Sequence, residues 1–377
     1  MSKMPVMFHK PFIASHSEDK LHQAVQAGSL AGNGSLSREA AALVQQITHA
    51  GEVIMTASCS AALQMCATLL RIESGDEIIV PSFTHPASVS AFAAAGAAIR
   101  WIDIVKDTRV LDIAALPALI SPRTRAVVTV HYGGVSADMI ALRRFCDTNG
   151  LVLIEDAAMA LDASWQTKPL GSWGDLAVFS FHQTKNIQCG EGGALCVNNH
   201  RFLEHAHLLQ HCGTNKAAFL QGEVPAYTWQ VFSSNYLMSA LQAAFLIPQL
   251  QQCPTVTSHL RNLWQHYSRR LSSVLSPEQL PLVPPQSQHN GHCFTILCAS
   301  YRQRQACIAF LHEYGIQAVF HYQPLHRAPV WQGAFDAVEL PVTEEVAATI
   351  LRLPMHFYLT VQDVDAVCDA LATFFTG

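Results

Sequence analysis

Short apolar runs alternate with stretches of helical periodicity through the first half of the chain. An apolar run of about four to eight residues bounded by turn residues predicts a buried strand. The predicted strands are Val53–Ala57, Glu77–Val80, Ile99–Ile104, Ala126–His131 and Leu151–Asp156. The predicted helices are Ser60–Glu73, Pro86–Ala95, Ile113–Ile120 and Asp138–Asn149. Strands that alternate with helices are typical of βα units, so the pattern favours an α/β fold with a parallel sheet.

The pattern changes after Asp156. Two further strands are predicted at Leu176–Phe181 and Ala194–Val197, and the segment between them is predicted as a loop rather than a helix. A helix is predicted at about His200–Gln210. These strands would complete a mixed, predominantly parallel sheet that helices cover on both faces.

A second unit is expected in the last third of the chain. An apolar helix, Met238–Leu250, leads towards it, and Pro248 and Pro254 are expected to break that helix. The elements predicted beyond it are helices at Ser258–Val274 and Val361–Phe375 and strands at Phe294–Cys298 and Ala318–His321. We therefore expect a large α/β domain over residues 1–250 and a smaller α+β domain over residues 251–377.

Charged residues are sparse and narrow the classes of function. They make up 14% of the 377 residues, and 23 basic against 28 acidic side chains give a formal net charge of −5. A nucleic-acid-binding protein needs a basic surface to neutralise phosphates, and this composition supplies none. An apolar share of 50% excludes a disordered chain.

Targeting and metal-binding signals are equally sparse. The sequence has neither the run of about 18–20 apolar residues that a membrane span requires nor a basic-then-apolar leader. Its eleven cysteines form no C-x-x-C pair, which indicates reduced, mostly buried thiols. His207 and His211 have the spacing of helical metal ligands but lack the Glu of an H-E-x-x-H motif. We expect a cytoplasmic protein without a membrane segment or a bound metal.

Polar residues follow several predicted strands where the chain leaves the sheet, and ligands of open α/β sheets bind beyond such carboxyl ends. Ser58–Ala61 opens a helix with small hydroxyl residues, which present N–H groups and hydroxyls to a phosphate. Asp156 ends an apolar strand, where its carboxylate can pair with a protonated ring nitrogen or another cation. Lys185 follows the strand Leu176–Phe181 at the same edge.

A phosphate cradle, a carboxylate and a lysine are the three groups that pyridoxal 5′-phosphate (PLP) requires. A deprotonated lysine amine attacks the cofactor aldehyde, and an apolar, cation-rich site lowers the pKa of that amine. Each feature alone has an ordinary explanation as a helix cap or a solvated side chain. Their joint order along the chain favours a PLP site.

Motifs around these residues recur in a characteristic order. Six of them are Thr56–Ala61, Pro81–Thr84, Val130–Gly134, Glu155–Ala158, Phe179–Asn186 and Gly190–Gly193. They resemble the DegT/DnrJ/StrS-type sugar aminotransferases, which have fold type I of the PLP-dependent transferases, the aspartate-aminotransferase fold. The resemblance extends over nearly the whole chain.

Four more stretches resemble one branch of that family. They are Gly213–Lys216, Tyr227–Trp229, Tyr236–Ser239 and Phe320–His326. The branch converts TDP-4-keto-6-deoxyglucose to TDP-4-amino-4,6-dideoxygalactose for surface polysaccharide. The resemblance therefore implies a PLP-dependent aminotransferase that uses such a nucleotide sugar and takes its amino group from L-glutamate.

The resemblance also implies roles for individual residues in binding PLP. Lys185 would bond the cofactor and shuttle a proton, and Asp156 would keep the pyridine nitrogen protonated. The residues implied for the cofactor phosphate are Cys59, Ser60, Ser180 and Asn235 of the partner subunit. Because the partner subunit would complete the site, the resemblance implies a homodimer with shared active sites.

Two positions depart from the family pattern. His85 stands where a bulky aromatic residue usually covers the cofactor ring, and its imidazole adds a titratable group there. Met159 stands where the family has a Gln near the phenolic oxygen of the cofactor, and a thioether cannot donate that hydrogen bond.

Signals for the nucleotide sugar are weaker. A diphosphate requires cations or N–H groups, for which Lys216 and the turn residues Gly32 and Asn33 are candidates. His321 and His326 are candidates for contacts to the sugar. Solvation, turn chemistry or a place in the core would explain the same residues without a substrate.

Alternatives to this function stay open. The substrate could be another nucleotide keto-sugar, with a 3-keto group or a different nucleotide, or the chain could be a catalytically altered or regulatory PLP-binding homologue. Lys185 argues against the related dehydratases, which have His at that position. A Rossmann oxidoreductase is disfavoured because no G-x-G-x-x-G follows a predicted strand.

Overall fold

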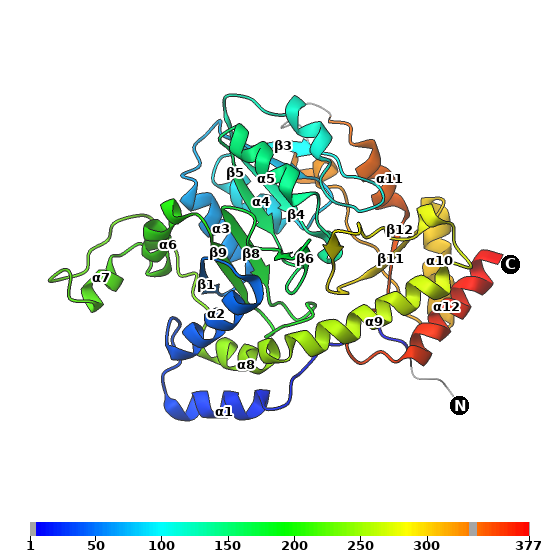
Figure 1. The fold of residues 1–377 in the computed structure, drawn as a ribbon, viewed down its shortest axis with the longest axis horizontal. Coiled ribbons are helices and arrows are strands. Elements are labelled where there is room, and N and C mark those ends of the chain that lie inside the picture. The colour runs from blue at the N-terminus through cyan, green and yellow to red at the C-terminus, as the bar shows by residue number, and fades with distance from the viewer. Residues whose placement is uncertain (1–4, 332–337, 377) are drawn as a thin grey trace.

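A seven-stranded sheet forms the centre of the molecule (Figure 1). The computed structural model describes residues 5–331 and 338–376. The strand order is β1-β9-β8-β5-β4-β2-β3. The bounds are β1 (Glu52–Thr56), β2 (Glu77–Pro81), β3 (Ala98–Ile102), β4 (Thr124–Val130), β5 (Val152–Asp156), β8 (Leu176–Ser180) and β9 (Gly193–Val197). All strands run parallel except β9, which is antiparallel to both of its neighbours. The predicted mixed, mostly parallel sheet is confirmed.

Helices cover both faces of this sheet, and alternate residues of each strand pack against opposite layers. On β1, Val53 and Met55 belong to one core while Ile54 belongs to the other. The first core includes α2 (Ser35–Thr48), α5 (Met139–Thr148) and α8 (Ala240–Gln251), and the second includes α3 (Cys59–Leu69), α4 (Ala87–Ala94) and α6 (Leu203–Gln210). Because both faces are buried, the strands have the near-continuous apolar runs from which they were predicted.

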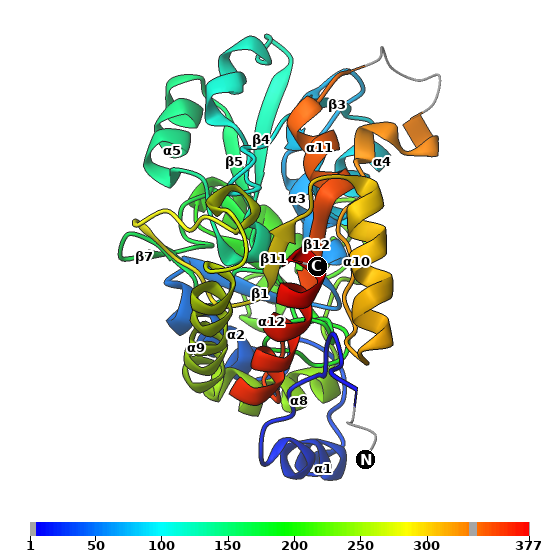
Figure 2. The ribbon, with the colours of Figure 1, turned by 90° about the vertical axis from the view of Figure 1, so that its right-hand side faces the viewer.

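The C-terminal part of the chain packs beside one end of the sheet. Its elements are α9 (Cys253–Leu271), β11 (Phe294–Leu297), α10 (Tyr301–Glu313), α11 (Pro341–Thr349), β12 (Ile350–Leu353) and α12 (Val361–Thr376). Strands β11 and β12 pair in antiparallel fashion, and α12 lies between α9 and α10 (Figure 2). We propose the boundary between the two domains at residues 250 and 251, between α8 on the large sheet and α9 under α12.

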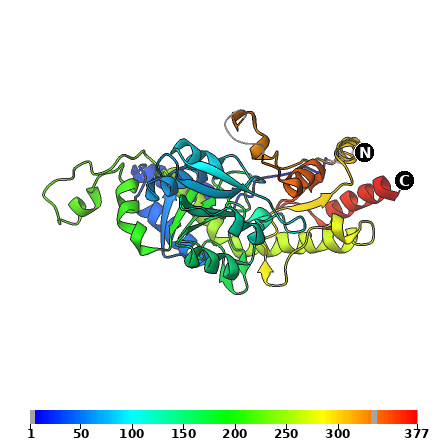
Figure 3. The same ribbon diagram turned by 90° about the horizontal axis from the view of Figure 1, so that it is seen from above.

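Several shorter helices and strands pack around the large sheet and the C-terminal part of the chain. Helix α1 (Ser17–Ala27) packs on α8, and a small sheet joins β6 (Ser164–Trp165), β7 (Lys168–Pro169) and β10 (Ser287–Gln288). Helix α7 (Lys216–Leu220) lies in an arm that extends from α6 away from the C-terminal part (Figure 3). No helix in the described part of the chain is both long enough and apolar enough to cross a membrane.

Several sequence-based expectations about local structure were wrong. Pro248 does not end the helix but lies inside α8, whose buried packing offsets the one N–H that proline lacks. Pro254 lies in the first turn of α9, where no N–H is needed, so that helix begins at Cys253. Residues 318–321 form no strand, because only Val319 bridges to Arg352. The segment after Asp112 is a 3₁₀-helix over Ile113–Ala118, with Pro117 inside it.

Candidate active site

A cavity of about 660 Å³ opens at the carboxyl edge of the sheet. Its walls come from the ends of β1, β4, β5 and β8, from the segment before α1 and from the C-terminal part of the chain. Seven of the predicted site residues line it: Cys59, Ser60, His85, Asp156, Met159, Ser180 and Lys185. His321 lines it as well.

Asp156 is held in one orientation at the end of β5. Its Oδ2 accepts a hydrogen bond of 2.6 Å from the Ser88 hydroxyl, and its Oδ1 accepts one of 3.1 Å from the backbone N–H of Ala158. Ser88 in α4 and Thr84, which precedes that helix, share a hydrogen bond of 2.8 Å between their hydroxyls. The carboxylate is buried and forms no ion pair with any described residue. It is therefore available to a cation in the cavity.

Lys185 follows β8 in the hairpin-like connection to β9. Its backbone N–H donates a hydrogen bond of 2.9 Å to the carbonyl oxygen of His182, which places the lysine in a tight turn. Burial lowers the pKa of Lys185, and the neighbouring Arg352 lowers it further, while Asp156 opposes this shift. A lowered pKa increases the fraction of free amine at neutral pH, which is the form that attacks a carbonyl.

The start of α3 forms a cradle opposite Lys185. The Ser58 hydroxyl caps the helix by accepting from the N–H of Ala61 at 3.1 Å. Backbone N–H groups in a first helical turn have no partner within the helix and can bind an anion. Gly193 packs so closely here that a Cβ on it would lie 2.4 Å from the Cys59 nitrogen. Glycine at this position thus lets β9 abut the cradle.

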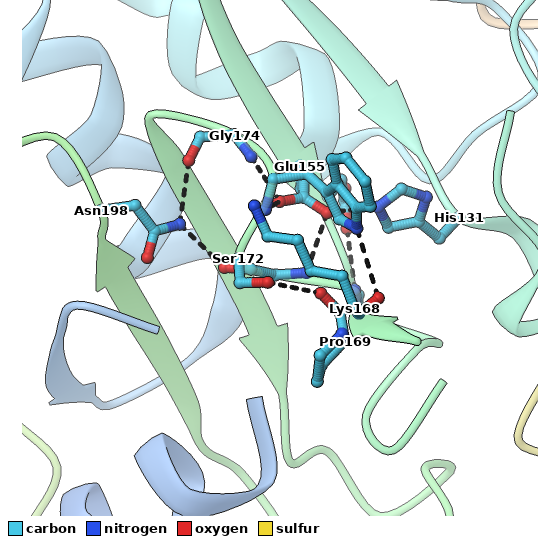
Figure 4. A network of polar contacts seen from close by, with 11 residues as sticks. His131, Glu155, Lys168, Pro169, Ser172, Gly174 and Asn198 are labelled. Atoms are coloured by element: carbon cyan, nitrogen blue, oxygen red, sulfur yellow. Dashed lines mark hydrogen bonds and ion pairs between the residues drawn. The ribbon is translucent and has the colours of Figure 1, made fainter. Parts of the chain in front are cut away.

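Glu155, which precedes Asp156, points to the other face of the sheet and forms a network of its own (Figure 4). It accepts hydrogen bonds from His131 Nε2 and from three backbone N–H groups, those of Gly171, Trp173 and Gly174, at 2.6–2.9 Å. Burial alone would raise the pKa of Glu155. The hydrogen bonds and the contact with His131 lower it by more than burial raises it, so the pKa lies below its usual value. Glu155 is therefore a structural anion that fixes the end of β5.

The wall formed by the N- and C-terminal segments is rich in cationic and imidazole groups. Arg352 is buried beside His321 and forms no ion pair with the described residues, and its Nε has no hydrogen-bond partner among them. Burial and Arg352 lower the pKa of His321 to about 3. Burial likewise lowers the pKa of His292 well below its usual range. Both imidazoles are neutral at pH 7, so Arg352 supplies the positive charge of this wall.

The two departures from the family pattern face the same cavity. Met159 Sδ accepts a long hydrogen bond of 3.5 Å from the N–H of Gly133. His85 Nδ1 accepts from the N–H of Ala87 at 3.2 Å, and its ring lies 6.3 Å from that of Tyr322 in an edge-on arrangement. Burial and Lys185 lower the pKa of His85, which favours the neutral ring.

Five predicted site residues lie away from this cavity in a single chain. Asn33 bonds to Gln210 and His211, and Gly32 packs against Leu237 and Met238. These five are Gly32, Asn33, Lys216, Asn235 and His326. Their proposed roles require either the partner subunit or a larger ligand, and they stay predictions.

His326 differs from the other four because its contacts lie inside this chain. Its Nδ1 shares a hydrogen bond of 2.7 Å with the Ser82 hydroxyl, and its Nε2 lies 3.0 Å from Glu344. The side chain is almost fully buried between these partners. These contacts fix the chain after β2 to α11 and explain the residue without a substrate.

The geometry agrees with what a comparison of sequences shows. The sequence profile described as the DegT/DnrJ/EryC1/StrS aminotransferase family matches residues 11–372. The chain belongs to this family. Its members are PLP-dependent sugar aminotransferases, so the chain is a PLP-dependent transaminase.

Solved structures of sugar aminotransferases share this fold. DesV of S. venezuelae is 26% identical, with a TM-score of 0.90 and full coverage of both chains. DesI, solved in the presence of its TDP-sugar product, is 28% identical, with a TM-score of 0.87 over 98% of this chain and 93% of its own. Spr1654 of Streptococcus pneumoniae in its PLP form is 22% identical, with a TM-score of 0.88 and 98% coverage of both chains.

The residues of this aminotransferase fit the cofactor. The cavity combines an anion cradle at the start of α3, a buried carboxylate without a cationic partner in the described chain and a lysine whose pKa burial lowers. These are the donor types that a phosphate, a pyridine nitrogen and an aldehyde require. The prediction of PLP as cofactor is confirmed by the family.

Sequence reasoning missed three residues that the structure brings to the site. Ser88 gave no signal in the sequence, because Thr84, with which it shares a hydrogen bond, precedes α4 and follows no helical pattern. Arg352 and Tyr322 lie about 170–200 residues beyond Asp156 in the sequence, and no local pattern connects them to it. The tertiary fold alone reveals these two.

Proposed function

We propose that this aminotransferase converts a TDP-linked 4-keto-6-deoxyhexose to the 4-amino-4,6-dideoxy sugar, with L-glutamate as amino donor. The observation that carries the proposal is the meeting of Lys185 and Asp156 in one cavity whose wall holds Arg352, which forms no ion pair with the described residues. The similarity of this chain to DesI, which was solved in the presence of its TDP-sugar product, supports TDP as the nucleotide of the substrate. The proposal includes a cytoplasmic location and a role in surface polysaccharide such as lipopolysaccharide.

The residues of the cradle and of β5 hold the cofactor in this proposal. When bound, PLP supplies an aldehyde that carries the amino group and a ring that accepts electrons. Cys59, Ser60 and Ser180 bind its phosphate, and Asp156 keeps a proton on its ring nitrogen. Ser88 orients the Asp156 carboxylate through the 2.6 Å hydrogen bond.

Lys185 moves the proton during amino transfer. Burial keeps its pKa low, so the amine can take a proton from one carbon and deliver it to another. His85 lines the same cavity, where it would cover one side of the cofactor ring. Met159 offers a thioether where a donor would otherwise bind the phenolic oxygen, so that oxygen receives no hydrogen bond from residue 159.

Arg352 binds a carboxylate of the amino donor. Its buried guanidinium forms no ion pair with the described residues and keeps N–H donors beyond its contact with His321, which suits a planar carboxylate. His321 stays neutral beside it, since its pKa is about 3, and therefore does not compete for the anion. This arrangement favours glutamate, whose carboxylate would give Arg352 the anionic partner that the described residues do not provide.

The arm that carries α7 argues for a homodimer. Large apolar side chains on it are exposed: Phe232 is 83%, Leu220 69% and Trp229 66% accessible. Exposed apolar patches of this kind mark interaction surfaces. A second copy would cover them and would bring Lys216 and Asn235 of the partner subunit towards the cavity and a bound diphosphate. Phe232→Asp combined with Trp229→Asp should then produce monomers in sedimentation velocity.

An amino-transfer assay tests the function. Purified holoenzyme is incubated with L-glutamate and TDP-4-keto-6-deoxyglucose, and the product is read by NMR for the position and stereochemistry of the amine. Formation of the 4-amino sugar is expected. Conversion of the cofactor by glutamate without a product from this sugar would indicate a different keto-sugar. No change of the cofactor absorbance with glutamate would indicate a regulatory homologue.

A further inference from the structure

A second, much smaller cavity is lined by Tyr132, which does not line the active-site cavity. Its volume is about 20 Å³. The loop after β3 provides Thr108 and Arg109, and the C-terminal part of the chain provides Trp264, Leu282 and Thr295. The cavity therefore lies between segments that are distant in the sequence, and the active site does not include it.

Arg109 is a buried cation in the wall of this cavity. Only 3% of the residue is accessible, and burial lowers the pKa of its guanidinium. One nitrogen donates to the backbone carbonyl of Asp107 at 2.6 Å, whereas Nε and the other terminal nitrogen have no partner among the described residues. The Asp107 side chain forms no ion pair with it. A buried cation without an ion pair and with unpartnered N–H groups destabilises the folded protein, so a compensating anion is expected.

Two hydroxyl groups in the wall of the cavity also lack hydrogen-bond partners. The hydroxyls of Tyr132 and Thr108 are buried and make no hydrogen bond to any described residue. His289 also lines the cavity, and its Nδ1 accepts a hydrogen bond of 3.0 Å from the N–H of Gly291. Burial lowers the pKa of His289 to about 4, so the ring is neutral at pH 7.

We propose that this cavity binds a single monatomic anion of the size of chloride, held by Arg109, Tyr132 and Thr108. A volume of about 20 Å³ admits one water-sized particle, since one such particle needs roughly 10–15 Å³ on this measure. Carboxylates, phosphate and sulfate are too large. An anion supplies the acceptor that several converging donors lack and compensates the charge of the guanidinium.

The anion would connect the two parts of the chain. It would fix the loop after β3 to the segment of Trp264, Leu282 and Thr295. It would also steady Tyr132, whose ring lies 5.2 Å from that of Phe83 and 6.2 Å from that of Tyr322 in the active-site wall. The anion site would thus stabilise the fold and position Tyr132, and the proposal does not depend on which substrate the enzyme uses.

Thermal unfolding of the holoenzyme tests the proposal without any substrate. Chloride is exchanged for gluconate, which is too large for the cavity, at constant ionic strength and pH. A saturable rise of about 2–4 °C in Tm with chloride is expected, because a ligand of the folded state stabilises it. Arg109→Met should abolish the dependence, whereas Arg302→Met, a change at an exposed arginine, should retain it. Equal responses in both variants, or none in the wild type, would overturn the proposal.

Crystallography of the unaltered holoenzyme in bromide provides a second test that survives a poorly folding Arg109→Met. An anomalous peak in contact with the Arg109 guanidinium is expected, with lower height when chloride competes. A cavity that holds water only, or bromide bound solely at the protein surface, would contradict the proposal.

Discussion

The Ser88 hydroxyl donates a 2.6 Å hydrogen bond to Oδ2 of Asp156, from the first turns of α4 to the end of β5. The bond leaves the carboxylate one fixed orientation and links the predicted pyridine-binding residue to a helix that the sequence did not connect with it. Charge-assisted hydrogen bonds of this kind are among the stronger ones in proteins.

Removing this hydroxyl should slow the enzyme without removing the cofactor. For Ser88→Ala we expect kcat to fall by about tenfold, because a hydrogen bond to a charged group contributes roughly 1.5–3 kcal/mol. Steady-state kinetics and cofactor absorbance against pH measure the effect. Ser90→Ala is the matched control, because Ser90 lies on the same helix and donates only to the Pro86 carbonyl. Equal kinetics in both variants would show that Ser88 does not position Asp156.

Lys185→Ala should abolish amino transfer while the protein stays folded. The variant should lose covalent retention of the cofactor after borohydride treatment, as judged by intact mass, and its Tm should change little. Lys168→Ala serves as control, because Lys168 packs over the Trp173 ring, away from the cavity. Full activity in Lys185→Ala would refute the assignment of the catalytic lysine.

Arg352→Met should change the KM for one substrate and leave the KM for the other nearly unchanged. If the guanidinium binds the donor carboxylate, KM for L-glutamate should rise by about tenfold or more, and KM for the keto-sugar should remain within about twofold. Initial rates with each substrate varied in turn provide the comparison. Arg269→Met, at an exposed position of α9, should behave as wild type. A selective rise in the KM for the sugar would instead place Arg352 on the nucleotide-sugar side.

Glu155→Gln should destabilise the protein in a pH-dependent way. The pKa of Glu155 is lowered on folding, so its stabilisation is fully present above the usual value of 4.5 and is lost as pH falls through the lower folded value. At pH 7 we expect a loss of about 3 kcal/mol in the free energy of unfolding, because a neutral amide replaces a buried carboxylate that accepts four hydrogen bonds.

Urea unfolding between pH 3 and pH 7 measures this loss. The difference between wild type and Glu155→Gln should shrink towards the acid end, where Glu155 becomes protonated in the wild type as well. Glu313→Gln, at an exposed position, is the control and should follow the wild-type curve. A difference that stays constant with pH would mean that the charge of Glu155 does not stabilise the fold.

The sequence predicted those parts of the fold that local patterns determine. The strands ending at Asp156 and preceding Lys185 lie within one or two residues of their predicted positions, because a strand buried on both faces is a continuous apolar run. Pro248 shows the limit of local rules, since tertiary packing keeps it within a helix. Arg352 shows the limit for the site, because only folding brings it to the cavity that Asp156 lines.

The antiparallel direction of β9 has a consequence for the connection that bears Lys185. Because β9 runs opposite to β8, this connection leaves and re-enters the sheet at the same edge, and Gly193 anchors its return against the start of α3. A parallel β9 would instead require a crossover to the opposite edge. The lysine thus lies in a short loop tethered at both ends, whose ordering costs little entropy when the cofactor arrives.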